Sequence, residues 1–166
     1  MSITIRNATA QDMSSVLQLI KELAIYEKEP EAVKIDEALL RELGTGDQPL
    51  FQCFVADTGQ KIVGMALVYF RFSTWVGKSL HLEDLVVAQK ERGKGIGTLL
   101  YNEVMRYAKA QQVKRVEWVV LDWNTPAISF YQKTGARLLK DWYLAQMDEG
   151  RLNQYLAQID SHTSTK

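Results

Sequence analysis

The stretch "SLHLEDLVVAQKERGKGIGTLL", residues 79–100, joins three patterns in one segment. Residues 79–87 contain an apolar run that predicts a strand, with two acidic residues inside it. Apolar residues with helical spacing begin directly after the turn at 93–97. That turn carries three glycines at alternate positions. Glycines let successive backbone N–H groups approach an anion, and a helix N-terminus adds about half a positive charge. The stretch therefore predicts a strand, a turn and a helix with an anion site at the turn.

The glycine spacing excludes two nucleotide motifs. A dinucleotide fingerprint requires G-x-G-x-x-G, whereas Gly93, Gly95 and Gly97 are spaced G-x-G-x-G. A P-loop requires a glycine five residues before its "GK" pair, but Phe72 stands at that position before the "GKS" of residues 77–79. From the residues alone, a glycine-rich turn that binds nothing remains the alternative.

The elements on either side indicate an α/β protein. Strands are predicted at 3–8, 51–57, 62–72, 79–87, 115–121 and 136–147, and helices at 9–26, 36–44, 96–108, 125–134 and 150–159. Thr9 and Asp12 have the spacing of a capping box, and Gly135 that of a left-handed helix cap. The apolar strand at 115–121 is expected to be central. This order predicts a mixed sheet flanked by helices, in a single domain over residues 1–160 with a polar tail at 161–166.

Composition excludes several classes of function. Twenty basic residues balance twenty acidic ones, so no overall field favours nucleic acid or an acidic membrane. Cys53 is the only cysteine and the two histidines lie far apart, so we expect no disulfide and no metal site. The longest apolar run, residues 64–70, is too short to span a bilayer, and the first residues lack a signal-peptide pattern. We expect a cytoplasmic location.

The chain resembles the GCN5-related N-acetyltransferases (GNAT). "RGKGIG" at 92–97 matches their R/Q-x-x-G-x-G/A signature and follows the strand "LEDLVV". The further segments "IRNAT", "LIKELAIYE", "LDWN" and "FYQKTGA" are similar to the diamine (spermidine/spermine) and thialysine acetyltransferase branch. The resemblance implies a mixed, mostly antiparallel sheet that splays around acetyl-CoA, and a homodimer.

The resemblance also implies which residues bind acetyl-CoA. Backbone N–H groups of the turn would bind the pyrophosphate, with added charge from two basic side chains. The end of the preceding strand would pair with the pantetheine arm like an added strand, and an asparagine would contact the coenzyme. The implied set is Leu85, Val86, Val87, Arg92, Gly93, Lys94, Gly95, Ile96, Gly97, Thr98 and Asn124.

Tyr131 and Glu83 are the candidate catalytic residues. Tyr131 matches the family tyrosine that protonates the leaving sulfur, whereas from its neighbours alone it would be a core aromatic. Glu83 matches a position that contacts the amine and can accept its proton through water; the alternative is a strand carboxylate paired with a basic neighbour. Asp84 is expected to be structural, and His81 a bystander.

Tyr26 and Glu27 match substrate-binding positions of the same branch. An acidic rim beside an aromatic face suits a cationic amine. Without the resemblance, Glu27 would be a solvated end of a helix. Cys53 is expected to be a buried strand residue rather than a nucleophile.

The choice of amine depends on two short segments. "RFSTW" at 71–75 lacks the aspartate that the polyamine branch carries near this tryptophan, and "VLDWN" at 120–124 looks closer to the thialysine branch. We therefore expect acetyl transfer from acetyl-CoA to a primary amine of a lysine-like molecule or a short diamine. The alternatives are a polyamine acetyltransferase, a peptide N-acetyltransferase and an acetyl-CoA sensor without turnover.

Overall fold

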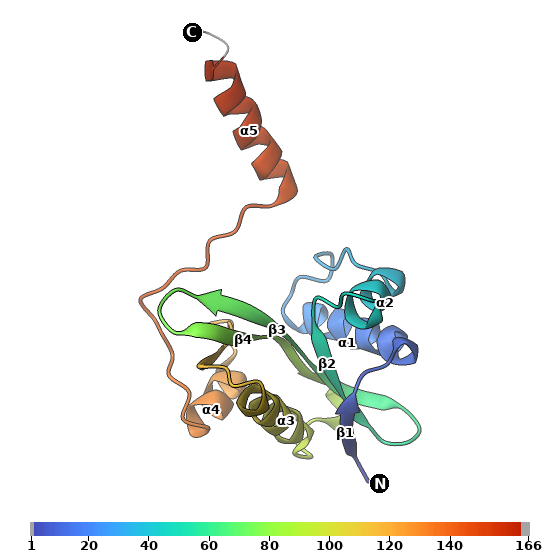
Figure 1. Ribbon diagram of the computed structural model, residues 1–166. Coiled ribbons are helices and arrows are strands. Elements are labelled where there is room, and N and C mark those ends of the chain that lie inside the picture. The colour runs from blue at the N-terminus through green and yellow to red at the C-terminus, as the bar shows by residue number, and fades with distance from the viewer. Residues whose placement is uncertain (1, 164–166) are drawn as a thin grey trace. The chain divides into compact units, whose positions relative to one another are not determined.

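The computed structural model describes residues 2–163, which form two compact units (Figure 1). One unit ends at Val119 and the other begins at Val120. The first contains β1 (Thr4–Asn7), η1 (Ala10–Asp12), α1 (Met13–Tyr26), α2 (Glu37–Thr45), β2 (Gln52–Asp57), β3 (Ile62–Ser73), β4 (Gly77–Val87), η2 (Gln89–Glu91), α3 (Ile96–Ala110) and β5 (Arg115–Glu117). The second contains α4 (Thr125–Lys133) and α5 (Glu149–Thr163).

The five strands form one mixed sheet in the order β1-β2-β3-β4-β5. The first four pair antiparallel, and β5 runs parallel to β4. Helices α1 and α2 cover one face of this sheet and α3 covers the other (Figure 1). The predicted fold class, an α/β mixed sheet flanked by helices, is confirmed.

The side chains of β2 point alternately to the two faces of the sheet, so this strand packs against helices on both sides. Cys53 and Val55 belong to the buried cluster on the α1 side, together with Val16 of that helix. Phe54 between them points to the other face, where its ring meets that of Tyr107 on α3 at 5.4 Å. Successive strand side chains point to opposite faces, so an apolar run of this kind is buried on both sides. Cys53 is a buried strand residue, as predicted, and burial raises the pKa of its thiol to about 12.

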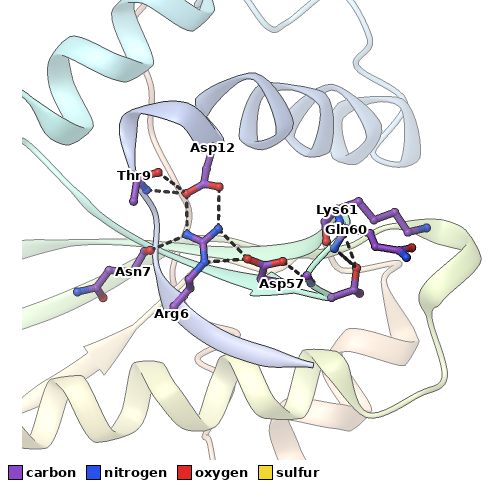
Figure 2. A network of polar contacts seen from close by, with 9 residues as sticks. Arg6, Asn7, Thr9, Asp12, Asp57, Gln60 and Lys61 are labelled. Atoms are coloured by element: carbon purple, nitrogen blue, oxygen red, sulfur yellow. Dashed lines mark hydrogen bonds and ion pairs between the residues drawn. The ribbon is translucent and has the colours of Figure 1, made fainter. Parts of the chain in front are cut away.

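A polar network fixes the start of the chain against the sheet (Figure 2). Arg6 on β1 donates from both terminal nitrogens to the Asp12 carboxylate, at 2.7 and 2.9 Å, and from Nε to Asp57 at 2.9 Å. Asp12 also accepts from the backbone N–H and the hydroxyl of Thr9, which confirms the predicted capping box. Pairing with Arg6 holds the pKa of Asp12 well below its usual range.

One predicted strand is shorter than expected and lies at another place in the sheet, and a second predicted strand is wrong. The strand expected at 115–121 is only three residues long and lies at the edge of the sheet rather than at its centre. Residues 136–147 form no strand, and Trp142 and Tyr143 there are 68% and 97% exposed. Within residues 2–163 no strand lies beyond β5, so the outer edge of β5 has no partner strand and residues 136–147 do not pair with the sheet.

The second unit follows the predicted helix boundaries closely. Asn124 caps α4 by accepting from Ala127 N at 3.4 Å, and Pro126 occupies its first turn. Gly135, at φ +91°, ends the helix as predicted. The last predicted helix is longer than expected, because α5 starts at Glu149 and continues through Thr163. Of the predicted polar tail, residues 164–166 lie outside the described residues.

Candidate functional site

The glycine turn presents a row of free backbone donors at the N-terminus of α3. Gly93 and Gly95 have φ of +78° and +79°, a conformation that favours glycine, and Gly95 is the N-cap. Among the described residues, none accepts a hydrogen bond from the N–H groups of residues 93–98. These six donors, together with the positive end of a 15-residue helix, fit a phosphate. The anion site at this turn stays a prediction, and the donors present fit it.

Both basic side chains of the turn are anchored within the first unit. Arg92 donates from Nε to the carbonyl of Val87 at 3.0 Å, and its guanidinium lies 4.9 Å from the centre of the Tyr26 ring. Lys94 lies 2.7 Å from Glu91, which also binds Lys61 at 2.8 Å. The two lysines hold the pKa of Glu91 below its usual range. The turn is therefore tied to β4 and to the β2–β3 connection.

Strand β4 has an open edge beside the turn. Its first part pairs with β5 over Ser79, Leu80 and His81. From Leu82 to Val87, β4 pairs with β3 on one side, but no strand among residues 2–163 pairs with its other side. An unpaired edge can bind an extended, amide-containing chain as an added strand. Leu85, Val86 and Val87 lie on this edge, so the residues present fit the predicted pantetheine contact.

Glu83 occupies a bulge in β4. The register passes from Leu67 opposite Asp84 to Val68 opposite Leu82, which leaves Glu83 as the extra residue. Bulges redirect side chains and are frequent beside active sites. The Glu83 carboxylate accepts from the Tyr69 hydroxyl at 2.9 Å and lies 3.5 Å from His81 Nε2. Its side chain is 50% exposed, so it is both positioned and accessible.

The sequence predicts only a structural role for Asp84, but its carboxyl has a strongly raised pKa. Burial, followed by the negative charges of Glu83 and Glu27, raises the pKa of its carboxyl to about 6. Burial also raises the pKa of Glu27, which caps the C-terminus of α1. No described residue donates a hydrogen bond to Asp84 that would offset this burial. A carboxyl that titrates near neutral pH beside two others suits a cationic ligand or proton transfer.

The sequence gives one indication that Asp84 belongs to the site, namely its position next to Glu83. On a regular strand, however, these neighbours would face opposite sides. The bulge changes that alternation, and a bulge depends on the register between two strands.

His81, predicted to have no role in the site, lies in contact with Glu83 and Arg71. It is buried against Tyr69, with ring centres 5.1 Å apart, and faces Glu83 through Nε2. Its Nδ1 lies 3.2 Å from Arg71 Nη1. Because a guanidinium can only donate, Nδ1 accepts and His81 is neutral. Burial lowers the pKa of this imidazole, in agreement with the neutral form.

The remaining candidate residues lie on separate elements. Tyr26 is the last residue of α1, directly before Glu27. Asn124 and Tyr131 belong to the second unit, on α4, where the Tyr131 ring packs at 5.4 Å from Phe130. The structure thus brings Glu83, Glu27 and the glycine turn into the first unit, whereas the tyrosine belongs to the second.

The described residues contain neither a metal cluster nor a membrane-spanning helix. No group of three or more His, Cys, Asp or Glu side chains within residues 2–163 is placed to hold a metal ion. No helix in the same range is long and apolar enough to cross a bilayer.

Comparisons with known proteins agree with this architecture. The model of the Acetyltransferase (GNAT) family matches residues 13–136. Thialysine N-epsilon-acetyltransferase of Sus scrofa is 39% identical over 148 residues, which cover 84% of this chain and 87% of that protein. Spermidine/spermine N(1)-acetyltransferase-like protein 1 of Homo sapiens is 35% identical over 158 residues, or 89% of this chain and 23% of that longer protein.

A solved structure shows the same fold. Integron cassette protein VCH_CASS6 of V. cholerae matches with a TM-score of 0.75 at 22% identity, over 94% of this chain and 98% of that one. The glycine turn and the bulged, open-edged strand lie inside the segment that matches the family model. The chain therefore belongs to the GNAT family of acetyltransferases and is an acyltransferase.

Proposed function

We propose that this protein transfers the acetyl group of acetyl-CoA to the primary amine of a lysine-like small molecule or a short diamine. The observation that carries the proposal is the group of three carboxyls, Glu27, Glu83 and Asp84, near the open edge of β4. An acidic group attracts an alkylammonium ion. The similarity to a thialysine acetyltransferase supports the lysine-like choice, and the similarity to a spermidine/spermine acetyltransferase-like protein keeps polyamines as the second candidate.

The amine must lose a proton before it can attack, because an alkylamine is protonated at neutral pH. Glu83 is half exposed and held by Tyr69, which suits a base that accepts this proton directly or through water. Asp84, whose pKa is about 6, is mostly ionised at pH 7 and can attract the ammonium group of the incoming amine together with Glu83. The C–N bond forms as the thioester C–S bond breaks, and Tyr131 donates a proton to the departing sulfur.

The groups of the glycine turn would hold the coenzyme during this reaction. Six free N–H groups at residues 93–98 would bind the pyrophosphate, and Leu85 to Val87 would bind the pantetheine arm. Asn124 would contact the coenzyme from the start of α4. Acetyl-CoA supplies the activated acetyl group, and no metal takes part in the proposed reaction. A cytoplasmic, homodimeric enzyme is part of the proposal.

Release of coenzyme A from acetyl-CoA in the presence of thialysine tests the proposal. We expect turnover by the wild type and a loss of about a hundredfold in kcat for Glu83→Gln, the usual contribution of a general base. Glu103→Gln on α3 is the matched control, since Glu103 pairs with a surface arginine at 3.4 Å, and it should leave kcat unchanged. Turnover that is absent in the wild type, or unchanged in Glu83→Gln, would contradict the proposal.

A further inference from the structure

The face of the sheet that carries Glu83 has a cationic end as well as an acidic one. Tyr69 and Arg71 lie two residues apart on β3, and their partners on β4 are His81 and Ser79. Side chains two residues apart share a face and are about 7 Å apart along a strand. Tyr69 marks the acidic end because it binds Glu83, and Arg71 marks the other end. The strand positions that carry the two ends are thus separated by about the length of an extended lysine side chain.

The Arg71 guanidinium is fixed on one side and open on the other. Its Nη1 contacts His81 Nδ1 at 3.2 Å and Glu117 Oε1 at 3.0 Å. Nε and Nη2 form no hydrogen bond or ion pair with any residue from 2 to 163. The side chain is 51% exposed. This open edge presents the parallel pair of N–H donors that binds a carboxylate in a bidentate manner.

Glu117 does not cancel the positive charge at this end. Its second oxygen lies 2.7 Å from Arg115 Nε, so one carboxylate is shared between two guanidinium groups. His81, the third ionisable group in contact with Arg71, is neutral because its Nδ1 accepts from the guanidinium. The three charged side chains Arg71, Arg115 and Glu117 therefore sum to one positive charge, which attracts an anion and repels a second ammonium group.

We propose that Arg71 binds the carboxylate of the substrate through its Nε–Nη2 edge, so that the enzyme selects amino acids with a terminal amine over diamines and polyamines. This inference rests on the proposed function and narrows its substrate class. The terminal amine lies at Glu83 while the carboxylate lies at Arg71. A diamine or polyamine of similar length lacks a carboxylate for Arg71 to bind. Its second ammonium group would also be repelled by the positive charge at this end.

Matched substrates test the inference. Lysine and cadaverine carry the same reacting amine and differ by the carboxylate, and lysinamide keeps the α-amine while removing the negative charge. We expect the wild type to favour lysine over cadaverine and lysinamide in kcat/KM by about ten- to a hundredfold, the effect of one charge-assisted bidentate pair. Arg71→Met should abolish that ratio by lowering kcat/KM for lysine while cadaverine keeps or gains rate. Arg71→Lys, which keeps the charge without the fork, should give an intermediate ratio.

The control variant is Arg106→Met on α3, where the arginine is 72% exposed and pairs with Glu103, and its ratio should equal that of the wild type. Equal rates for lysine and cadaverine in the wild type would overturn the inference and leave the proposed acetyltransferase standing. A loss in Arg71→Met that is equal for both substrates would assign Arg71 a structural role and also overturn it. Wild-type protein that acetylates none of the amines would overturn the proposed function, and this inference with it.

Discussion

Replacing Asp84 should make the folded protein more stable at neutral pH, because its carboxyl is buried beside two other acidic groups. Folding raises the pKa of this carboxyl from 3.8 to about 6, chiefly through burial and then through the charges of Glu83 and Glu27. A shift of roughly two units corresponds to about 3 kcal/mol. Since an asparagine amide also loses some hydration when it is buried, we expect Asp84→Asn to gain about 2–3 kcal/mol in free energy of unfolding at pH 7.

The sign of the pH dependence follows from proton uptake. Between pH 4 and 6 the folded state holds the Asp84 proton while the unfolded state has lost it, so wild-type stability falls as the pH rises through this window. The advantage of Asp84→Asn should be absent below pH 4, grow up to about pH 6 and stay constant above it. Thermal unfolding should show a gain of about 4–12 °C at pH 7.

Asp57→Asn is the matched control for this measurement. Bonds from Gly59 N and Arg6 lower the pKa of Asp57, so its replacement should reduce stability at pH 7. An Asp84→Asn variant no more stable than the wild type at pH 7, or one with the same gain at pH 4, would show that burial of this carboxyl does not cost stability. The same variant should lose acetyltransferase activity, which would identify Asp84 as a group kept for function at the expense of stability.

Three further predictions concern other parts of the molecule. Arg6→Met removes the cation that binds Asp12 and should lower the free energy of unfolding by about 1–3 kcal/mol at pH 7. The difference should shrink as the pH falls below about 4, because Asp12 then binds a proton in the unfolded state but stays ionised beside Arg6 in the folded state; urea titrations at several pH values measure it. Gly95→Ala places a Cβ at φ +79° and should cost about 1–2 kcal/mol of stability and raise the KM for acetyl-CoA, which steady-state kinetics would detect. Tyr131→Phe should lower kcat, and full turnover across the pH range would remove Tyr131 as the acid.

Local chemistry made much of the fold predictable from the sequence. Thr9 and Asp12 form the expected capping box, and Asp36 caps α2 by accepting from Leu39 N at 2.8 Å. The three-glycine turn lies at the start of α3, as its pattern predicted. Each of these features is encoded within a few residues, so no knowledge of distant segments is needed.

Features that depend on distant segments could not be predicted in the same way. Whether the strand at 115–121 is central depends on a further strand beside it, and its own residues do not encode that neighbour. The bulge at Glu83 depends on the register between β3 and β4, and the raised pKa of Asp84 depends on burial and on the charges of Glu83 and Glu27. The contact of Arg71 with Glu117 joins residues far apart in the chain. No pattern in either segment indicates this pair.

Coenzyme A release measured against a panel of amines distinguishes the proposed substrate class from its alternatives. The panel contains thialysine, lysine, putrescine, spermidine, spermine and a peptide with a free N-terminus, with mass spectrometry to identify each acetylated product. We expect the highest kcat/KM for thialysine or lysine, with acetylation at the terminal amine. The highest kcat/KM for spermidine, spermine or the peptide, or no release with any amine, would contradict this expectation.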